Sequence, residues 1–183
     1  MKRSTWIVLV IFLALVGLTV YLNQNQLPAD ETEVTPTETV EYLFSATNGL
    51  PSSIDIEART GGQVAIERNE AGQWVLKQPI EAEANQGSAE AAASQLSALR
   101  IISRPEVALD EAGLVGPSYV MTVKLTGGKV AVVRIGDLTP TSSGYYTNVN
   151  GSDEVLIVGK TGLDALLTMV TSPPFLDSPT PVP

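Results

Sequence analysis

The stretch of the sequence with the most side chains that could do chemistry is IGDLTPTSSGYYTN, residues 135–148. It combines a carboxylate, hydroxyls and two adjacent phenols, carried by Asp137, Ser142, Ser143, Tyr145 and Tyr146. Tyrosine offers contact area and a hydrogen-bonding tip, so the stretch could be a recognition loop for a sugar or a peptide. We favour the alternative, a plain connection between strands whose two tyrosines point to opposite faces, one into the core and one outward. Neither a suitably spaced lysine nor a following helix is present, so it is not a phosphate-binding loop.

Pairs of acidic residues are the other candidates for chemistry. Three pairs occur: Asp110 with Glu111, Asp153 with Glu154, and Glu81 with Glu83. All three are expected in turns or loops, where neighbouring exposed acids rarely have the burial that separates the two pKa values of an acid and a base. None has the alternate Asp spacing of a calcium loop. We therefore predict no catalytic, cofactor-binding or metal-binding residue.

The composition removes further classes of site. The chain of 183 residues has no His and no Cys, which excludes Ser–His–Asp and Cys–His catalysis, His-ligated zinc and disulfide bonds. All 20 acidic residues but only 9 of the 11 basic ones follow residue 22, because Lys2 and Arg3 precede it. Such an acidic surface repels nucleic acid, so no nucleic-acid partner is expected.

Short runs separated by turn signals predict the strands that position these side chains. SIDIEART, QVAIERN and QWVLKQP are joined at Gly61-Gly62 and Ala71-Gly72, which predicts a three-stranded meander. Trp74 alternates with Leu76 on one strand face, so a core position is expected for it. A second set, YVMTVKL, KVAVVRIG, GYYTNV and EVLIVG, follows later in the chain. Its Asn150-Gly151 dipeptide suits a hairpin turn, which is a sufficient explanation of the NGS glycosylation pattern there.

Two segments change to a helical period. In residues 84–104 apolar side chains recur every three or four positions up to Ile102, which predicts a long helix that ends before Pro105. A short helix is predicted from about Thr161 to before Pro173. Since the strands come in hairpins, the predicted class is α+β, a mainly antiparallel meander sheet with one long and one short helix packed on it.

The two sets of strands share a phrase. TGGQVAIER at Thr60–Arg68 and TGGKVAVVR at Thr126–Arg134 match at six of nine positions. The match has two explanations: a duplicated meander-plus-helix unit, or the recurrence of similar hairpin turns by chance.

Residues 6–22 are uncharged and predict a transmembrane signal anchor. As a helix these 17 residues would span about 25 Å at about 1.5 Å per residue. Trp6 and Tyr21 stand at the two ends, where membrane interfaces favour aromatic residues, and Lys2 and Arg3 keep the N-terminus cytoplasmic. No good cleavage site follows, so we favour an uncleaved anchor over a cleaved signal peptide or a buried soluble helix.

The anchor defines the predicted organisation of the chain. A cytoplasmic N-terminus (1–5) and the anchor (6–22) precede a flexible tether (23–39), an extracytoplasmic α+β domain (40–172) and a disordered proline-rich tail (173–183). The expected location is the cytoplasmic membrane, crossed once, with the main domain outside.

Several marks, taken in order, carry a family resemblance. They are Trp74-x-Leu76-x-x-Pro79, the Ala-rich helix with Leu96 and Leu99, Gly113-Leu114-x-x-Pro117, Ile135-Gly136, Gly144-x-Tyr146 and the strand 155–158. Over residues 53–170 the chain resembles the bacterial family catalogued as domain of unknown function 4340. The resemblance implies a membrane-anchored envelope protein, often found beside components of gliding-motility-type ABC transport systems, and it implies no catalytic residues.

The leading functional hypothesis is a non-catalytic accessory or binding module, held in the bacterial membrane through residues 6–22 and associated with a protein of a transport or envelope complex. One alternative is an envelope hydrolase or carbohydrate-active enzyme that uses carboxylates. Another is a structural spacer whose sheet packs edge to edge with copies of itself.

Overall fold

The structure is a computed structural model, and it describes residues 21, 40–44, 47 and 49–176. Within these residues, no helix is long and apolar enough to cross a bilayer. Lys2, Arg3, Trp6 and the predicted tether lie outside the described residues, as does the predicted anchor apart from Tyr21. The membrane segment therefore stays a prediction.

The described strands form one antiparallel sheet of ten strands. In chain order they are β1 (Glu41–Tyr42), β2 (Pro51–Ala58), β3 (Gln63–Arg68), β4 (Trp74–Gln78), β5 (Ala82–Glu83), β6 (Arg100–Ser103), β7 (Tyr119–Leu125), β8 (Val130–Leu138), β9 (Gly144–Val149) and β10 (Leu156–Gly159). Their order across the sheet is β1-β6-β10-β9-β8-β7-β2-β3-β4-β5. The predicted α+β class and antiparallel pairing are confirmed, and the first meander has a fourth short strand, β5.

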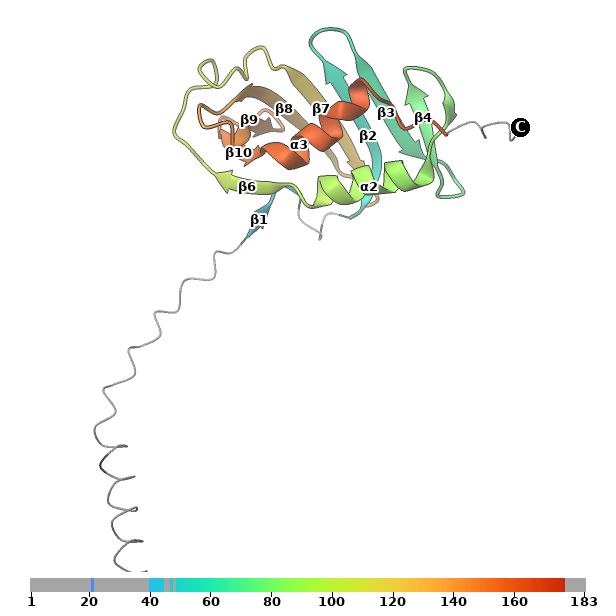
Figure 1. Cartoon of the computed structure of the whole chain (residues 1–183), viewed down its shortest axis with the longest axis horizontal. Helices are drawn as coiled ribbons and strands as arrows, with labels where there is room; N and C mark the ends of the chain where they lie inside the picture. Colours follow the sequence, from blue (N-terminus) through green and yellow to red (C-terminus); the bar gives the residue numbers. More distant parts are fainter. Residues whose placement is uncertain (1–20, 22–39, 45–46, 48, 177–183) are drawn as a thin grey trace, which may run out of the picture. The chain divides into compact units, whose positions relative to one another are not determined.

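Both helices lie on the same face of the sheet (Figure 1). They are α2 (Gln86–Ser97) and α3 (Lys160–Leu167), and a short 3-10 turn, η2 (Thr168–Val170), follows α3. Asn85 caps α2, because its side chain accepts a hydrogen bond from the Ser88 amide. The predicted long and short helices are therefore both confirmed.

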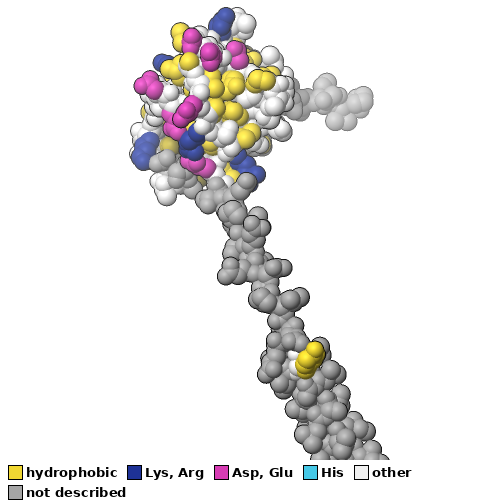
Figure 2. All heavy atoms as spheres, turned by 90° about the vertical axis from the view of Figure 1, so that its left-hand side faces the viewer, with side chains coloured by type: hydrophobic (Ala, Val, Ile, Leu, Met, Phe, Trp, Pro, Cys, Tyr) yellow, Lys and Arg dark blue, Asp and Glu magenta, His cyan; other side chains and the backbone are white. Residues whose placement is uncertain are grey.

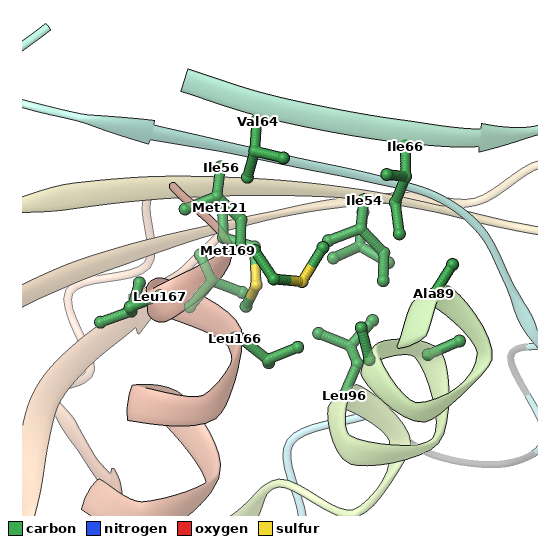
Figure 3. Close-up of a cluster of buried hydrophobic side chains, with 14 of the residues drawn as sticks. Ile54, Ile56, Val64, Ile66, Ala89, Leu96, Met121, Leu166, Leu167 and Met169 are labelled. Atoms are coloured by element: carbon green, nitrogen blue, oxygen red, sulfur yellow. The ribbon is translucent and has the colours of Figure 1, made fainter. Parts of the chain in front are cut away.

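The main core lies between the helices and the sheet. Ile54, Ile56, Val64 and Ile66 extend from β2 and β3 toward Leu96 and Ala89 of α2 and Leu166 of α3 (Figure 3). The alternation of Ile54, Ile56 and Ala58 in the sequence predicted this inward face, and all three are buried. Trp74 is 1% exposed, so its predicted core position is confirmed.

A smaller apolar cluster lies on the opposite face of the sheet. Ala112, Leu114 and Val155 are buried there, with Tyr146 packed against them. The chain from Arg104 to Ser118, which connects β6 to β7, supplies most of this cover. It covers part of the second set of strands.

One element differs from the prediction. The long helix ends at Ser97, and Ile102 lies in the strand β6 instead of the helix. Ile101 and Ile102 are β-branched, and β6 pairs with the edge of β10, so tertiary pairing outweighs the helical period here.

The two sets of strands are arranged as two equivalent halves, β2–β5 with α2 and β7–β10 with α3. A shift of 67 residues (121 − 54) superposes the pairing of β2 with β3 on that of β7 with β8: Ile54↔Ile66 becomes Met121↔Val133. The central pairing of β2 with β7 fits the same shift. Ile54 faces Val123 and Ile56 faces Met121, and the shift exchanges these two pairs. The halves are thus related by an approximate two-fold axis.

The shared TGG phrase does not follow this axis. Gly61 and Gly128 are the equivalent turn residues, because each amide bonds to the last residue of the preceding strand, Ala58 or Leu125. The sequence match instead aligns Gly61 with Gly127, one residue away. A one-residue slip exchanges the two faces of a strand, so the repeat lies in the topology and the phrase itself is out of register.

Candidate functional site

The predicted recognition loop is divided by the sheet. Tyr145 points to the helix face, where its hydroxyl donates a hydrogen bond of 2.7 Å to Asp164 Oδ1 of α3. Tyr146 packs on the opposite face against Ala112, Leu114 and Val155. The two phenols therefore serve different surfaces.

The remaining predicted loop residues are exposed. Asp137 lies beside the Gly113 turn, since a Cβ on Gly113 would be 2.7 Å from its carboxyl group. The Ser143 hydroxyl lies 2.9 Å from that of Thr141, and the Ser143 carbonyl accepts from the Lys160 amide. Ser142 has a positive φ of 54°. These contacts fix the loop itself, and the structure does not bring the five residues into one pocket.

The three predicted acid pairs are all exposed. Glu154 accepts a hydrogen bond from Arg104. Glu81 forms an ion pair with Lys77, which stands four residues earlier in the chain. The hydrogen bond from Lys77 lowers the pKa of Glu81. Among the described residues, no group of three or more potential ligands could hold a metal ion.

A groove of about 510 Å³ lies between the two helices and the chain that follows them. Its lining consists of apolar and uncharged polar residues: Asn85, Ser88, Ala91, Ala92, Gln95, Ala165, Leu166, Thr168, Met169, Ser172, Pro173, Pro174 and Phe175. No lining residue carries a charge, although the chain has 31 charged residues. This groove is suited to an uncharged occupant.

The chemistry of the groove is apolar inside and polar at its margin. Leu166 and Met169 are buried below it, whereas Ala91 and Phe175 are exposed. The Gln95 carboxamide makes no hydrogen bond to a described residue, so its two donors and its acceptor are available. An apolar side chain with a neighbouring peptide group would meet both kinds of lining.

No local sequence pattern predicted this groove. Its only advance signal was the alanine- and serine-rich helix, which leaves small side chains on both faces of α2. The tail also contributes: Pro174 accepts from the Asn85 amide, and Phe175 bridges to Ala84. The predicted disordered tail thus begins with four described residues, 173–176, the last three of which pair with residues 83–85, and 177–183 lie outside the described residues.

Each helix is also fixed to the sheet by a carboxylate at its fifth residue. Glu90 of α2 accepts from Trp74 Nε1 at 2.9 Å and from Arg68 at 2.6 Å, while the Arg68 guanidinium stacks 4.4 Å above the Trp74 ring. Asp164 of α3 accepts from Tyr145 and from Lys160. The aromatic donors stand on the equivalent strands β4 and β9.

These bonds shift the titration of the groups involved. The hydrogen bond from Trp74 is the main reason that the pKa of Glu90 is lowered. Burial alone would raise the pKa of Asp164, but the hydrogen bonds from Lys160 and Tyr145 outweigh it and lower the value. Burial and the bond to Asp164 raise the pKa of Tyr145 to about 12. The lowered pKa values favour the ionised form of Glu90 and Asp164, the form in which each carboxylate accepts the hydrogen bonds that hold its helix on the sheet.

Comparison with known proteins gives a family and no closer relative. No curated protein matches the chain, and no solved structure matches it. A family model described as Domain of unknown function (DUF4340) matches residues 74–172, more than half of the chain, from β4 through η2. The family resemblance is confirmed: the chain belongs to the DUF4340 family.

Proposed function

We propose that the protein is a non-catalytic accessory module, tethered through residues 6–22 on the outer side of the bacterial cytoplasmic membrane, that binds a protein of a transport or envelope complex. The observation that carries the proposal is the uncharged groove between α2 and α3. An apolar floor with a few amide and hydroxyl groups at its margin is the usual character of a binding pocket, and no acidic, basic or phenolic side chain lines this one.

The carboxyl groups argue against the hydrolase alternative. A carboxylic acid that donates a proton needs a raised pKa, as burial would give it. The described carboxyl groups with a resolved shift, Glu41, Glu81, Glu90 and Asp164, all have lowered pKa values. Their partners are cationic or aromatic donors, which is the pattern of structural ion pairs.

The ends of the sheet argue against the spacer alternative. Both edge strands, β1 and β5, are only two residues long. Glu41 lies on one, and Glu83 on the other is followed by the pairing of Ala84 with Phe175. While β1 and β5 stay in place, these short and charged edge strands disfavour edge-to-edge pairing between two copies of the sheet.

A pair of single-cysteine variants tests the groove, since the chain has no other cysteine. Ala91→Cys places a photocrosslinker in the groove, and Glu57→Cys places the same reagent on the opposite face of the sheet, where Glu57 is exposed. In native membranes we expect a discrete crosslinked partner from Ala91→Cys and none from Glu57→Cys. Equal products from both, or no product from Ala91→Cys, would reject the groove as the binding site.

The tethering is tested separately by washing membranes with alkaline carbonate. The full-length protein is expected to stay in the membrane fraction, and a chain lacking residues 6–22 is expected in the supernatant. Release of the full-length chain would reject the anchor while leaving the groove experiment interpretable, provided that the crosslinking is repeated with the released protein.

A further inference from the structure

The strand β6 forms one end of the sheet apart from its short cover, β1 (Figure 1). β1 contributes only two pairs, Glu41↔Ile101 and Tyr42↔Arg100, to the four residues of β6. Ile102 is 54% exposed, and Arg100 and Ser103 are exposed as well. Much of this edge is therefore open to an additional or replacement strand.

A basic clamp lies beside the same edge. Arg104 follows β6 directly, and its guanidinium makes two parallel hydrogen bonds of 2.5 Å to the Glu41 carboxylate. Its Nε donates to Glu154 at 2.7 Å. Arg100 is exposed and forms no ion pair with the part of the chain that the structure describes. The edge thus offers two arginines, one engaged in a bidentate carboxylate geometry.

The strand that occupies this edge is weakly held. Both residues of β1 are exposed, and the Arg104–Glu41 pair is exposed too, at 42% and 51%. The next residues hold the chain more firmly, because the Leu43 amide bonds to the Leu99 carbonyl at 2.8 Å and Phe44 is 8% exposed. Release of Glu41 and Tyr42 from β6 would break two strand pairs and one exposed ion pair, and it would leave the contacts of Leu43 and Phe44 in place.

We infer that the β6 edge is a docking site for an extended acidic segment of a partner protein, and that β1 occupies it as an intramolecular substitute. The bound segment adds an antiparallel strand to β6 and places a carboxylate on Arg104, as Glu41 does. A second acidic residue would meet Arg100.

The arginines beside β6 favour an acidic partner segment. The chain is acidic overall, with net charge −9, so a site for another acidic segment needs local arginines. Arg100 and Arg104 supply them on either side of two isoleucines. Figure 2, which views the side where β6 lies in Figure 1, shows acidic, basic and hydrophobic side chains mixed on that surface. The opposite edge has Glu81, Glu83 and the chain from Pro173 instead. The site is distinct from the helix groove and does not depend on the proposed function.

A reversible disulfide can close the edge. Tyr42 and Arg100 are directly opposite each other, a separation that a disulfide can bridge, and the chain has no other cysteine. The Tyr42→Cys/Arg100→Cys variant of the full-length protein is prepared in detergent micelles, oxidised or reduced. The probe is a fluorescein-labelled peptide, TETVEY, which copies residues 37–42, and its control is TETVQY. Fluorescence anisotropy gives the dissociation constants.

We expect the reduced variant to bind TETVEY at least 10-fold more tightly than the oxidised one, and TETVQY about 5-fold more weakly than TETVEY, because the control lacks the carboxylate for Arg104. Circular dichroism in both redox states checks that the domain is folded. Equal binding in the two states, or no binding to the reduced protein, would overturn the inference.

A second variant avoids altering β6. Glu41→Gln removes the clamp on β1 and should tighten TETVEY binding about 2- to 5-fold over the unmodified chain, whereas Glu41→Gln/Arg104→Gln should lose that gain. No gain in the first variant contradicts competition by β1. If Glu41→Gln forms dimers on gel filtration and ignores the peptide, the occupant is a second copy of the chain, and the partner-protein assignment is wrong.

Discussion

The first half of the domain, β2–β5 with α2, and the second half, β7–β10 with α3, share one topology but differ in their connections. In the first half, β3 and β4 are joined by a compact turn in which Asn69 Oδ1 accepts from the amides of Ala71 and Gln73. In the second, β8 has an irregularity between Ile135 and Leu138, and a longer loop leads to Gly144.

The longer connection accommodates the chain that joins the halves. Gly136 lies against Ala112, because a Cβ at Gly136 would be 2.1 Å from the Ala112 carbonyl oxygen. The Asp137 amide donates to the same carbonyl. Among the described residues, no segment covers the first half in this way, and its corresponding face carries the half-buried Asp55 and Glu67 and the exposed Glu57. The core therefore preserves the two-fold arrangement, and the joining segment breaks it.

The largest effect is expected from truncating equivalent core residues. Ile66→Ala in β3 should lower the free energy of unfolding by about 3 kcal/mol and Val133→Ala in β8 by about 2 kcal/mol, because each leaves a cavity under the helices. One core joins both halves, so each variant should show a single shifted transition in chemical denaturation followed by circular dichroism. Exposed Glu57→Ala is the control; two separate transitions would show that the halves unfold independently.

The next effect comes from the two helix anchors. Glu90→Ala should cost about 1 to 3 kcal/mol, because the Trp74 indole N–H is left buried without an acceptor. Tyr145→Phe should cost about 1 kcal/mol, since it removes the bond to Asp164 but leaves that carboxylate paired with Lys160. Glu90→Gln keeps an acceptor and is the control for the first variant. Equal losses for Glu90→Ala and Glu90→Gln would rule out the orphaned indole as the cause.

Glycine substitutions in the two helices should have opposite signs. Gly87→Ala in α2 meets only Asn85 Oδ1 at 3.5 Å, so better helix propensity should raise stability by about 0.5 kcal/mol. Gly162→Ala in α3 would place its Cβ 2.9 Å from Leu99 Cδ2 and Gln95 Nε2, which should lower stability by up to about 1 kcal/mol. Thermal unfolding of both variants measures the difference. Stabilisation by both would mean that α3 lies less close to α2 than the structure indicates.

The smallest effect is confined to alkaline pH. The pKa of Tyr145 is raised to about 12 in the folded protein, above its ordinary value of 10.0, so the folded state retains the phenol proton longer. This contribution to stability is complete below pH 10 and is lost as the pH rises toward 12. Tyr145→Phe should therefore show a shallower loss between pH 10 and 12. Phenolate absorbance should show one fewer group titrating near 12, and an unchanged titration near 12 would show that Tyr145 is not the group with the raised pKa.

Much of the fold could be predicted from local pattern. Gly61-Gly62, Ala71-Gly72 and Asn150-Gly151 mark turns because those conformations favour glycine, and Gly61, Gly72 and Gly151 have positive φ. Alternation identified the inward side chains of β2. The predicted long helix extended too far, into β6. A period of three or four residues does not show that a neighbouring strand is available for pairing.

The candidate sites were harder to predict. Because the polar residues from Asp137 to Tyr146 are adjacent in sequence, a single recognition loop was one interpretation. Successive strand residues face opposite sides, so Tyr145 and Tyr146 are separated, as the alternative of a plain strand connection predicted. The groove joins residues about 80 positions apart, Ala91 and Phe175, and neither segment alone signals it. The clamp of Arg104 on Glu41 likewise spans 63 positions.

The α+β class, the hairpins, the core position of Trp74, the lack of His and Cys chemistry, and the family could all be predicted from the sequence. These features follow from local periodicity, turn-forming residues and composition, which act over a few neighbours. The tertiary structure was needed to show that the two halves meet about a two-fold axis, that Glu90 and Asp164 fix the helices, and that a groove and an arginine-bearing edge result. Those features depend on which distant segments share buried surface, and the free energy of that burial is a property of the whole packed domain.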